Sequence, residues 1–415
     1  MKIVFLSDDF PPTSFGGAGI STFELAVGMK KAGHEVFVIT TCRKDAEAGE
    51  SEYHGLTVLK LASDYAPRWR AYISLYNRPV VRQVEQLLKE IKPDVVHANN
   101  IHYYLSYHSL KIAKRYARVV VFTARDAMTF NFGKLTTKKY LENMDCHTTW
   151  HDHIVQAQKG YNPFRNFCIK KYLKYTDKKF AVSYALQKAL VQNGIKDVDV
   201  IHTGADVEQW CANEDEKNLF KKKYGLENKK VILFGGRLSE GKGGGKTLEA
   251  FVRIHKEVPD ATLLVAGSID AYADSMKEKA RVLGIGDKLI ITGWIERDVV
   301  RVAYEVADVV LVPSLCLDSF PRIVIEAMAS RKPVVGTCYG GAPEIIVDGV
   351  TGYVVNPFYS EEIASKTIDL LRNPKKAEEF GSAGYERIKK DFNLEDKFKE
   401  YIVVYESLVR QTDHR

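Results

Sequence analysis

Short runs of consecutive apolar residues recur along the chain, each followed by a segment of helical periodicity, and this alternation constrains the fold more than any other feature. The first run covers residues 3–6. A second run at 35–40 follows after a Pro- and Gly-rich loop and a helical pattern. Continuous apolar runs are typical of parallel strands that are buried between two layers of helices. The pattern therefore predicts an α/β fold built from strand–helix–strand units.

The alternation occurs in two sets, which predicts two domains. With 415 residues, the chain is longer than the roughly 100–200 residues that usually share one core. We predict two doubly wound, Rossmann-like domains facing a cleft, over residues 1–205 and 206–390. The polar stretch 213–230 reads as a connecting segment, and the helical pattern of 391–415 is expected to pack back on the first domain. The remaining predicted strands are residues 95–97, 119–122, 179–182, 231–236, 261–266, 289–292, 309–312 and 333–336.

The amino-acid composition indicates the cellular compartment in which the protein is expected to work. The six cysteines are scattered and form no Cys-x-x-Cys pair, which favours reduced thiols over a disulfide or zinc framework. The sequence contains no run of about 18 apolar residues, so it predicts no membrane-spanning helix. The N-terminal segment lacks the long apolar stretch of a signal peptide. We expect a cytoplasmic protein, with a peripheral position at the inner membrane surface as an open alternative.

Residues 127–178 form an aromatic and basic insertion between two predicted strands of the first domain. A strand-to-strand crossover needs far fewer residues, and long loops of this kind usually serve function. Such positive charge suits an anionic membrane surface, a lipid-linked acceptor or simply a solvated helix face, and we expect no nucleic-acid partner. Between Lys159 and Lys179 the single acid is Asp177, and the basic residues are Lys159, Arg165, Lys170, Lys171, Lys174, Lys178 and Lys179.

Two acidic residues, Asp318 and Glu326, are separated by seven other residues in a predicted strand–loop–helix segment. The helix is expected to begin near Pro321, because proline is favoured in a first turn. Backbone N–H groups at such a helix start attract anions and hydroxyl oxygens, and carboxylates accept hydrogen bonds from vicinal hydroxyls. The pair suits two sugar rings, although a capping Asp followed by a helix-surface Glu gives the same spacing.

A glycine-rich loop over residues 235–243 follows another predicted strand. Its glycines, Gly236 among them, allow the backbone to approach a diphosphate closely. Arg237 and Lys242 place two cations in the same loop. The loop therefore predicts a diphosphate-binding site.

Together these motifs resemble those of the large family of retaining two-domain glycosyltransferases, family four, which has the GT-B fold. The resemblance covers nearly the whole chain. It implies transfer of a sugar from a nucleotide-diphosphate sugar to a glycan, lipid or small-molecule acceptor, without a metal or other cofactor. It also implies that Arg237 and Lys242 hold the diphosphate, Asp318 the hexose and Glu326 the ribose, as the catalytic set. Further implied nucleotide-sugar contacts are Gly16, Gly17, Gly236, Trp294, Ile295, Ser319, Phe320 and Arg322.

Three positions depart from the family pattern. Asp318 stands where Glu is usual, and Pro321, which has no N–H group, stands where Gly is usual. Arg125 replaces the usual His next to Asp126, at a position expected to contact sugar or acceptor, and Arg cannot act as a general base. The sequence therefore leaves open a nucleotide-sugar-binding protein with impaired catalysis. An epimerase or a phosphorylase of the same fold is also open.

Other motifs match less well. Gly245, Lys246 and Thr247 end like a phosphate-binding loop of an ATPase, but that motif needs Gly where Glu240 stands. The Gly16–Gly17 loop has Thr22 where a dinucleotide-binding motif has its third Gly. We expect no metal site, although His147, His151 and His153, and the pair Asp197 and Asp199, imitate metal ligands.

Overall fold

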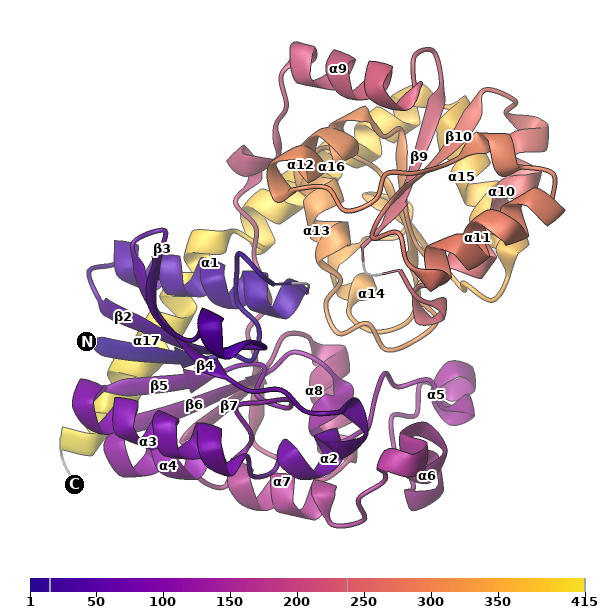
Figure 1. Cartoon of the computed structure of the whole chain (residues 1–415). Helices are drawn as coiled ribbons and strands as arrows, with labels where there is room; N and C mark the ends of the chain where they lie inside the picture. Colours follow the sequence, from indigo (N-terminus) through magenta and orange to yellow (C-terminus); the bar gives the residue numbers. More distant parts are fainter. Residues whose placement is uncertain (15, 237, 414–415) are drawn as a thin grey trace. The chain divides into compact units, whose positions relative to one another are not determined.

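The computed structural model describes residues 1–14, 16–236 and 238–413. The chain divides into two compact units (Figure 1). Unit 1 comprises Met1–His202 and Glu395–Arg415, and unit 2 comprises Thr203–Leu394. Each unit has its own sheet of mostly parallel strands with helices on both faces, which is the α/β architecture expected from the apolar runs.

Unit 1 contains an eight-stranded sheet in the order β3-β4-β2-β1-β5-β6-β7-β8. The pairing is parallel except for the β3–β4 hairpin. Its strands are β1 (Lys2–Leu6), β2 (Glu35–Cys42), β3 (Gly49–Tyr53), β4 (Leu56–Ala62), β5 (Val95–Ala98), β6 (Val119–Ala124), β7 (Lys178–Ala181) and β8 (Val198–Val200). Its α-helices are α1 (Gly17–Lys31), α2 (Arg70–Ile73), α3 (Arg78–Ile91), α4 (His108–Tyr116), α5 (Lys138–Asn143), α6 (Trp150–Ala157), α7 (Arg165–Leu173), α8 (Tyr184–Gln192) and α17 (Leu394–Asp413), and its 3₁₀ turns are η1 (Asp45–Glu47), η2 (Pro67–Trp69), η3 (Ala127–Thr129) and η4 (Gln158–Gly160).

The C-terminal helix α17 packs on the sheet of unit 1, on the face that α1 also covers (Figure 1). Its Tyr405 hydroxyl lies 2.5 Å from Nδ1 of His97 in β5, and Nε2 of His97 lies 2.7 Å from the Thr123 hydroxyl. Burial holds the pKa of His97 well below its ordinary value, so the imidazole is neutral. A fully hydrogen-bonded neutral His thus joins the C-terminal helix to the core.

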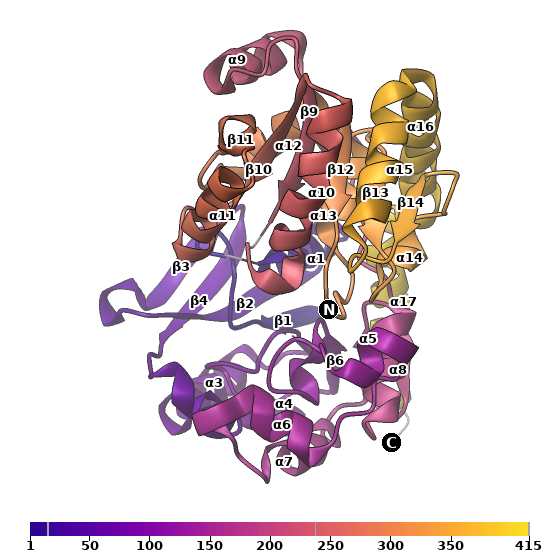
Figure 2. The same cartoon turned by 90° about the vertical axis from the view of Figure 1, so that its right-hand side faces the viewer.

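Unit 2 contains a parallel six-stranded sheet in the order β11-β10-β9-β12-β13-β14. In Figures 1 and 2, α10, α11 and α15 cover one face of this sheet and α12, α13 and α16 cover the other. Its strands are β9 (Lys230–Gly235), β10 (Ala261–Ala266), β11 (Leu289–Ile291), β12 (Val309–Val312), β13 (Val334–Thr337) and β14 (Gly352–Val355). Its helices are η5 (Val207–Trp210), α9 (Glu214–Tyr224), η6 (Glu240–Lys242), α10 (Gly244–Glu257), α11 (Ala271–Val282), η7 (Gly286–Lys288), α12 (Arg297–Val306), α13 (Arg322–Ala329), α14 (Ala342–Ile345), α15 (Ser360–Arg372) and α16 (Pro374–Asp391).

The interpretation of residues 213–230 as a connecting segment was wrong, because most of it is helix α9. A capping box begins this helix: the Asn213 side chain accepts from the Glu216 N–H, and the Glu216 carboxylate accepts from the Asn213 N–H. Gly225 ends it in the left-handed conformation, with φ 63°. Phe220 is the only buried residue that α9 contributes, so the segment has no apolar stripe to reveal a helix.

The insertion 127–178 folds into short helices, and α7 serves as the crossover helix into β7. One of its expected surface cations, Arg165, is instead buried. Its guanidinium donates to the carbonyl oxygens of Met128 and Asn131, and burial lowers the pKa of Arg165 to about 10. Arg165 therefore ties the insertion to the end of β6 and adds nothing to the surface charge.

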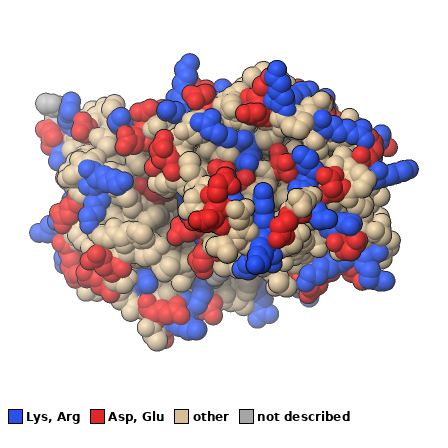
Figure 3. All heavy atoms as spheres, turned by 90° about the horizontal axis from the view of Figure 1, so that it is seen from above, with Lys and Arg blue, Asp and Glu red and all other residues tan. Residues whose placement is uncertain are grey.

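The other charged side chains include both basic and acidic residues. Lys178 forms an ion pair with Asp199 on the neighbouring strand β8, which gives Asp199 a structural role. On the face drawn in Figure 3, basic and acidic side chains are interspersed, as suits a net charge of only +7. Within the described ranges, no helix is both long enough and apolar enough to span a bilayer.

Candidate functional site

The loops after β9 and β12 lie where the strand order of unit 2 reverses. β9 and β12 are neighbours, while β10 and β11 continue the sheet on one side and β13 and β14 on the other. Doubly wound sheets bind ligands at such a reversal, outside the carboxyl ends of the strands. The glycine motif of residues 235–243 follows β9, and the acidic string follows β12. The fold therefore brings these two predicted motifs together.

Backbone contacts hold the two loops against each other. The N–H of Leu315 donates to the carbonyl oxygen of Gly241 at 3.0 Å. Gly243 has φ 83°, and a Cβ built on it would clash with the carbonyl oxygen of Pro313. Only glycine combines that dihedral angle with so close an approach. The glycine at this position is therefore required by loop packing, whatever ligand binds.

Lys242 and Asp318 meet at this junction. The Lys242 ammonium lies 2.5 Å from Oδ2 of Asp318, and the Ser314 hydroxyl donates to the same oxygen at 3.1 Å. Burial lowers the pKa of Lys242, but the Asp318 carboxylate outweighs that effect and raises it above its ordinary value. Lys242 is thus a charged ammonium that is held by one of the predicted sugar-binding carboxylates.

The backbone of Asp318 is fixed from the other side. Its carbonyl oxygen accepts from the N–H of Gly341 at 2.9 Å, and a Cβ on Gly340, where φ is 69°, would clash with it. The next two side chains, Ser319 and Phe320, are buried. These two predicted contact residues are therefore part of the packed interior of the loop.

Glu326, in the second turn of α13, accepts two hydrogen bonds from unit 2. Nε of Arg322 donates to Oε1 at 3.2 Å, and the Tyr304 hydroxyl donates to Oε2 at 2.9 Å. Burial, and then the Glu326 charge, raise the pKa of Tyr304 well above its ordinary value, so Tyr304 is a neutral donor. The expected first-turn Pro321 is instead the N-cap residue of α13.

Other predicted contacts of unit 2 lie on the same edge of the sheet. Gly236 has φ 97°, and a Cβ built on it would meet no heavy atom within 4 Å among the described residues other than its chain neighbours. Its neighbour Arg237 lies outside the described residues. Trp294, 59% exposed, follows β11 together with the half-buried Ile295. Because the strands are parallel, this loop shares the edge with the two central loops.

In unit 1 the equivalent reversal lies between β1 and β5. Gly16 is the N-cap of α1 and Gly17 its first residue. Asp8, two residues after the end of β1, is buried, and its carboxylate accepts from the backbone N–H groups of residues 103, 104 and 105. Burial raises the pKa of Asp8 to about 7, against the lowering effect of these three donors. Sequence reasoning missed Asp8, although an acid just after a buried strand was a usable signal.

Arg125 and Asp126 lie at the carboxyl end of β6, in different roles. Nε of Arg125 donates to Oδ1 of Asn99 at 3.0 Å. Asp126 caps η3 by accepting from the N–H of Met128, and its Oδ2 lies 3.5 Å from Nε2 of His102. Burial lowers the pKa of His102 to about 4, with Asp126 opposing the shift. His102 is a second buried polar group that the sequence did not single out.

The rival motifs serve structure. Lys246 and Thr247 lie inside α10, where Lys246 pairs with Glu249 and the Thr247 hydroxyl bonds to the Gly243 carbonyl oxygen. Both are therefore occupied within the helix rather than in a phosphate-binding loop. Among the residues that the structure describes, no three His, Cys, Asp or Glu side chains gather as metal ligands would.

Comparison with known proteins identifies the family of the chain. Residues 216–387 match the family described as glycosyl transferases group 1, and residues 15–209 match Glycosyltransferase Family 4. A relative from Mycolicibacterium smegmatis, a GDP-mannose-dependent alpha-(1-6)-phosphatidylinositol monomannoside mannosyltransferase, is 28% identical over 51% of this chain and 54% of its own length. The chain thus spans about half the length of some of the curated relatives that it matches.

Two further similarities extend over nearly the whole chain. The N-acetyl-alpha-D-glucosaminyl L-malate synthase of Bacillus anthracis is 24% identical over 96% of this chain and 95% of its own length. The crystal structure of Anabaena Alr3699/HepE in complex with UDP and glucose has a TM-score of 0.75 at 18% identity, covering 98% of this chain and 100% of that chain. The two family matches, one in each unit, and this shared fold show that the chain belongs to the group 1, family 4 glycosyltransferases of the GT-B fold.

Proposed function

We propose that the protein is a retaining, metal-independent glycosyltransferase that moves a hexosyl group from a nucleotide-diphosphate sugar to a glycan, lipid or small-molecule acceptor. The observation that carries this proposal is the Lys242–Asp318 ion pair at the strand-order reversal of unit 2. A cation that holds a diphosphate and a carboxylate that holds sugar hydroxyls would there lie within reach of one ligand.

Binding of the nucleotide sugar would separate this pair. The diphosphate offers Lys242 more negative charge than Asp318 does, so the ammonium turns to the phosphate oxygens. The released Asp318 carboxylate then accepts hydrogen bonds from the hexose. Glu326, held by Arg322 and Tyr304, keeps lone pairs free for the ribose hydroxyls.

The transfer step depends on stabilising the leaving diphosphate. Lys242, together with Arg237 of the same loop, would supply the positive charge that a divalent ion supplies in metal-dependent transferases. Arg125 cannot accept the proton of the attacking hydroxyl. We therefore assign that proton to an oxygen of the leaving phosphate, on the face of the sugar that the phosphate leaves, which retains the anomeric configuration.

The identity of the nucleotide is approached through the relatives. The Anabaena protein was crystallised with UDP, and the mycobacterial relative uses GDP-mannose. UDP- and GDP-hexoses are therefore the first nucleotide sugars to test. The test is release of nucleoside diphosphate with a panel of acceptors, comparing Lys242→Ala with Lys246→Ala, a lysine four residues along whose partner is Glu249.

The acceptor is proposed to be lipid-linked or a polysaccharide, reached at the inner membrane surface. Phe164, the N-cap of α7, and Phe167 within it are both 70% exposed. Lys171 of the same helix and Lys174, its C-cap, are exposed as well. Aromatic rings beside lysines suit the boundary between lipid headgroups and acyl chains. We propose that this face of α7 rests on an anionic bilayer, as a peripheral contact of a cytoplasmic enzyme.

A further inference from the structure

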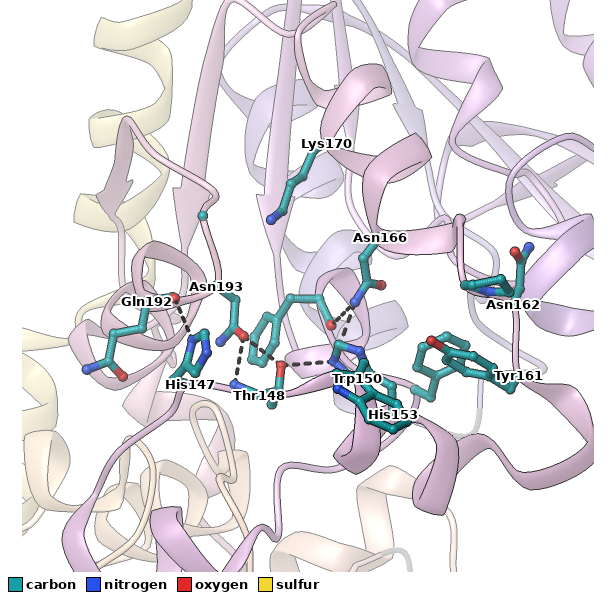
Figure 4. A pocket seen from close by; sticks show the side chains of 14 residues that line it. His147, Thr148, Trp150, His153, Tyr161, Asn162, Asn166, Lys170, Gln192 and Asn193 are labelled. Carbon is teal, nitrogen blue, oxygen red and sulfur yellow. Dashed lines mark hydrogen bonds between the residues drawn. The ribbon is translucent and has the colours of Figure 1, made fainter.

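Unit 1 contains a pocket of about 440 Å³ that shares no residue with the loops proposed to bind the nucleotide sugar. It lies among the loop before α6, the helices α6 and α7, and the C-terminal end of α8 (Figure 4). Volumes of about 300–1,000 Å³ are typical of small-molecule sites. All the residues that line it fall between 130 and 194, so the insertion builds most of the pocket.

A chain of hydrogen bonds makes its floor rigid. The Thr148 hydroxyl donates to Oδ1 of Asn193 at 2.6 Å, and Nδ2 of Asn193 donates to the Cys146 carbonyl oxygen at 2.8 Å. Because the Thr148 hydroxyl donates its single proton to Asn193, it must act as the acceptor toward Nε2 of His153, 2.9 Å away. Nδ1 of His153 is then left as an acceptor. Burial lowers the pKa of His153, which keeps this imidazole neutral.

One wall of the pocket is aromatic. The rings of Phe132 and Tyr161 lie 5.6 Å apart between centroids, and Trp150 is 69% exposed at the rim. A pyranose ring presents C–H groups on its faces and hydroxyls at its edge. Its faces pack on aromatic rings, which carry a large apolar area with a polar edge. A polar floor beside such a wall matches a sugar better than it matches a lipid chain or a peptide.

A cation faces this floor. Lys170 extends from α7, and its ammonium points toward Asn193 and Thr148 (Figure 4). A Cβ built on Gly194 would lie 2.8 Å from this ammonium, so glycine leaves the room that Lys170 occupies. No carboxylate of the described residues pairs with Lys170. The pocket thus offers positive charge together with a sugar-binding surface.

Helix α7 contributes to the pocket as well as to the proposed bilayer contact. Asn166 and Lys170, four residues apart on this helix, line the pocket. Phe167 and Lys171, each one position further along, are exposed and do not line it. One short helix therefore serves two surfaces of different chemistry.

The pocket is connected to Arg125 and Asp126, at the carboxyl end of β6, by a short piece of chain. Asp126 caps η3, and Phe130, which lines the pocket, follows directly after that turn. The buried Arg165 bonds to the carbonyl oxygens of Met128 and Asn131 on either side of Phe130. One rigid segment therefore forms both the edge beside Arg125 and the pocket wall.

We propose that this pocket binds an anionic sugar residue, a hexose that carries a phosphate or carboxylate, within the acceptor. This assignment of the acceptor rests on the proposed glycosyltransferase function. Trp150 covers a face of the sugar ring, the His153 and Thr148 floor meets its hydroxyls, and Lys170 pairs with the anionic substituent. The pocket holds the acceptor by a residue distant from the attacking hydroxyl.

The test uses the full chain and four probes: glucose 6-phosphate, glucuronate, glucose and inorganic phosphate. Calorimetry and saturation-transfer NMR are expected to show binding of at least one of the two anionic sugars, more strongly than glucose or phosphate. Lys170→Gln should weaken that binding about tenfold, as for loss of a charge-assisted contact, and Trp150→Ala should weaken it for both anionic sugars. Lys171→Gln, at an exposed lysine that does not line the pocket, should leave it unchanged.

Three results would overturn the proposal: none of the probes binds, phosphate alone binds as well as glucose 6-phosphate, or Lys170→Gln and Trp150→Ala bind like wild type. Nucleoside diphosphate binding is measured on the same variants and should not change. Sugar binding without any nucleotide binding would contradict the proposed glycosyltransferase function but would still support the pocket as a sugar-binding site. Once an acceptor is identified, Lys170→Gln should raise its KM and leave kcat unchanged, whereas loss of kcat alone would reject the pocket as an acceptor subsite.

Discussion

The ammonium of Lys242 lies 2.5 Å from the carboxylate of Asp318, although 76 residues separate them in the chain. The two side chains come from the loops after β9 and β12 and are only 23% and 16% exposed. Each therefore neutralises the other in the absence of a nucleotide sugar. A diphosphate that enters this edge must compete with Asp318 for Lys242, which couples phosphate binding to release of a sugar-binding carboxylate.

Removing Lys242 should abolish most of the transfer. In Lys242→Ala the leaving diphosphate loses a stabilising cation, and we expect kcat/KM to fall by about 100-fold or more. The measurement is the rate of nucleoside diphosphate release with the best nucleotide sugar and acceptor. The matched control, Lys246→Ala, should keep at least half of the rate, and equal losses in the two variants would place the phosphate site elsewhere.

Replacing Asp318 should separate sugar recognition from nucleotide recognition. In Asp318→Asn the hydrogen bonds to the hexose weaken while the diphosphate contacts remain, so turnover should fall by about tenfold or more. Binding of the nucleoside diphosphate alone should stay the same or become tighter, because Lys242 no longer has a carboxylate partner. Weaker nucleotide binding in this variant would show that Asp318 serves the phosphate end instead.

Tyr304 should be a positioning residue for Glu326. In Tyr304→Phe the carboxylate loses its hydrogen bond from the buried hydroxyl, and the expected loss of stability is about 1 kcal/mol. Urea unfolding followed by intrinsic fluorescence measures this loss. Nucleotide affinity should fall severalfold in Tyr304→Phe. An unchanged affinity would mean that the Tyr304 hydrogen bond is not needed to position Glu326 for the ribose.

Acid should destabilise unit 1 through His102. Its pKa is about 4 in the fold, below the value of about 6.5 in an unfolded chain. The buried neutral form therefore contributes stability that is fully present above pH 6.5 and is lost as the pH falls toward 4, by about 3 kcal/mol in all. Comparing the unfolding free energies of wild type and His102→Gln at several pH values isolates this contribution. Parallel curves for the two proteins would contradict it.

The bilayer contact predicts lipid-dependent binding. Wild-type protein should co-sediment with vesicles that contain phosphatidylglycerol at low ionic strength and much less at high salt, because the lysine contribution is screened. Replacing Phe164 and Phe167 together by Ser should reduce the bound fraction severalfold. Equal sedimentation with neutral and anionic vesicles, or no effect of the double replacement, would exclude this face of α7.

The sequence predicted the strands of the sheets better than the helix α9 or the ion pairs. Runs such as residues 3–6 are apolar throughout because helices cover both faces of the sheet, so their pattern survives in the sequence. Helix α9 buries only Phe220, which leaves no periodic signal. Likewise, a count of basic residues cannot distinguish the buried Arg165 from its exposed neighbours, because burial depends on carbonyl groups supplied by a distant turn.

For the candidate site, the residue types were predictable and their partners were not. Spacing and resemblance singled out Lys242, Asp318 and Glu326, but the direct contact between the first two depends on how Gly243 packs on Pro313. Asp8 was missed although its place after a buried strand was a usable signal, whereas His102 is recognisable only from its burial beside Asp126 in the fold. A sequence motif indicates which chemical groups are present. Contacts between side chains of different loops, in contrast, depend on how the loops fold at the edge of the sheet.

The most direct test of the central claim is a calorimetric titration of the full chain with UDP, GDP and ADP, repeated on Lys242→Ala and Lys246→Ala. The account predicts that at least one diphosphate binds, about 10- to 100-fold more weakly to Lys242→Ala and equally well to Lys246→Ala. Absence of binding by all three nucleotides, or equal affinity for wild type and Lys242→Ala, would contradict it.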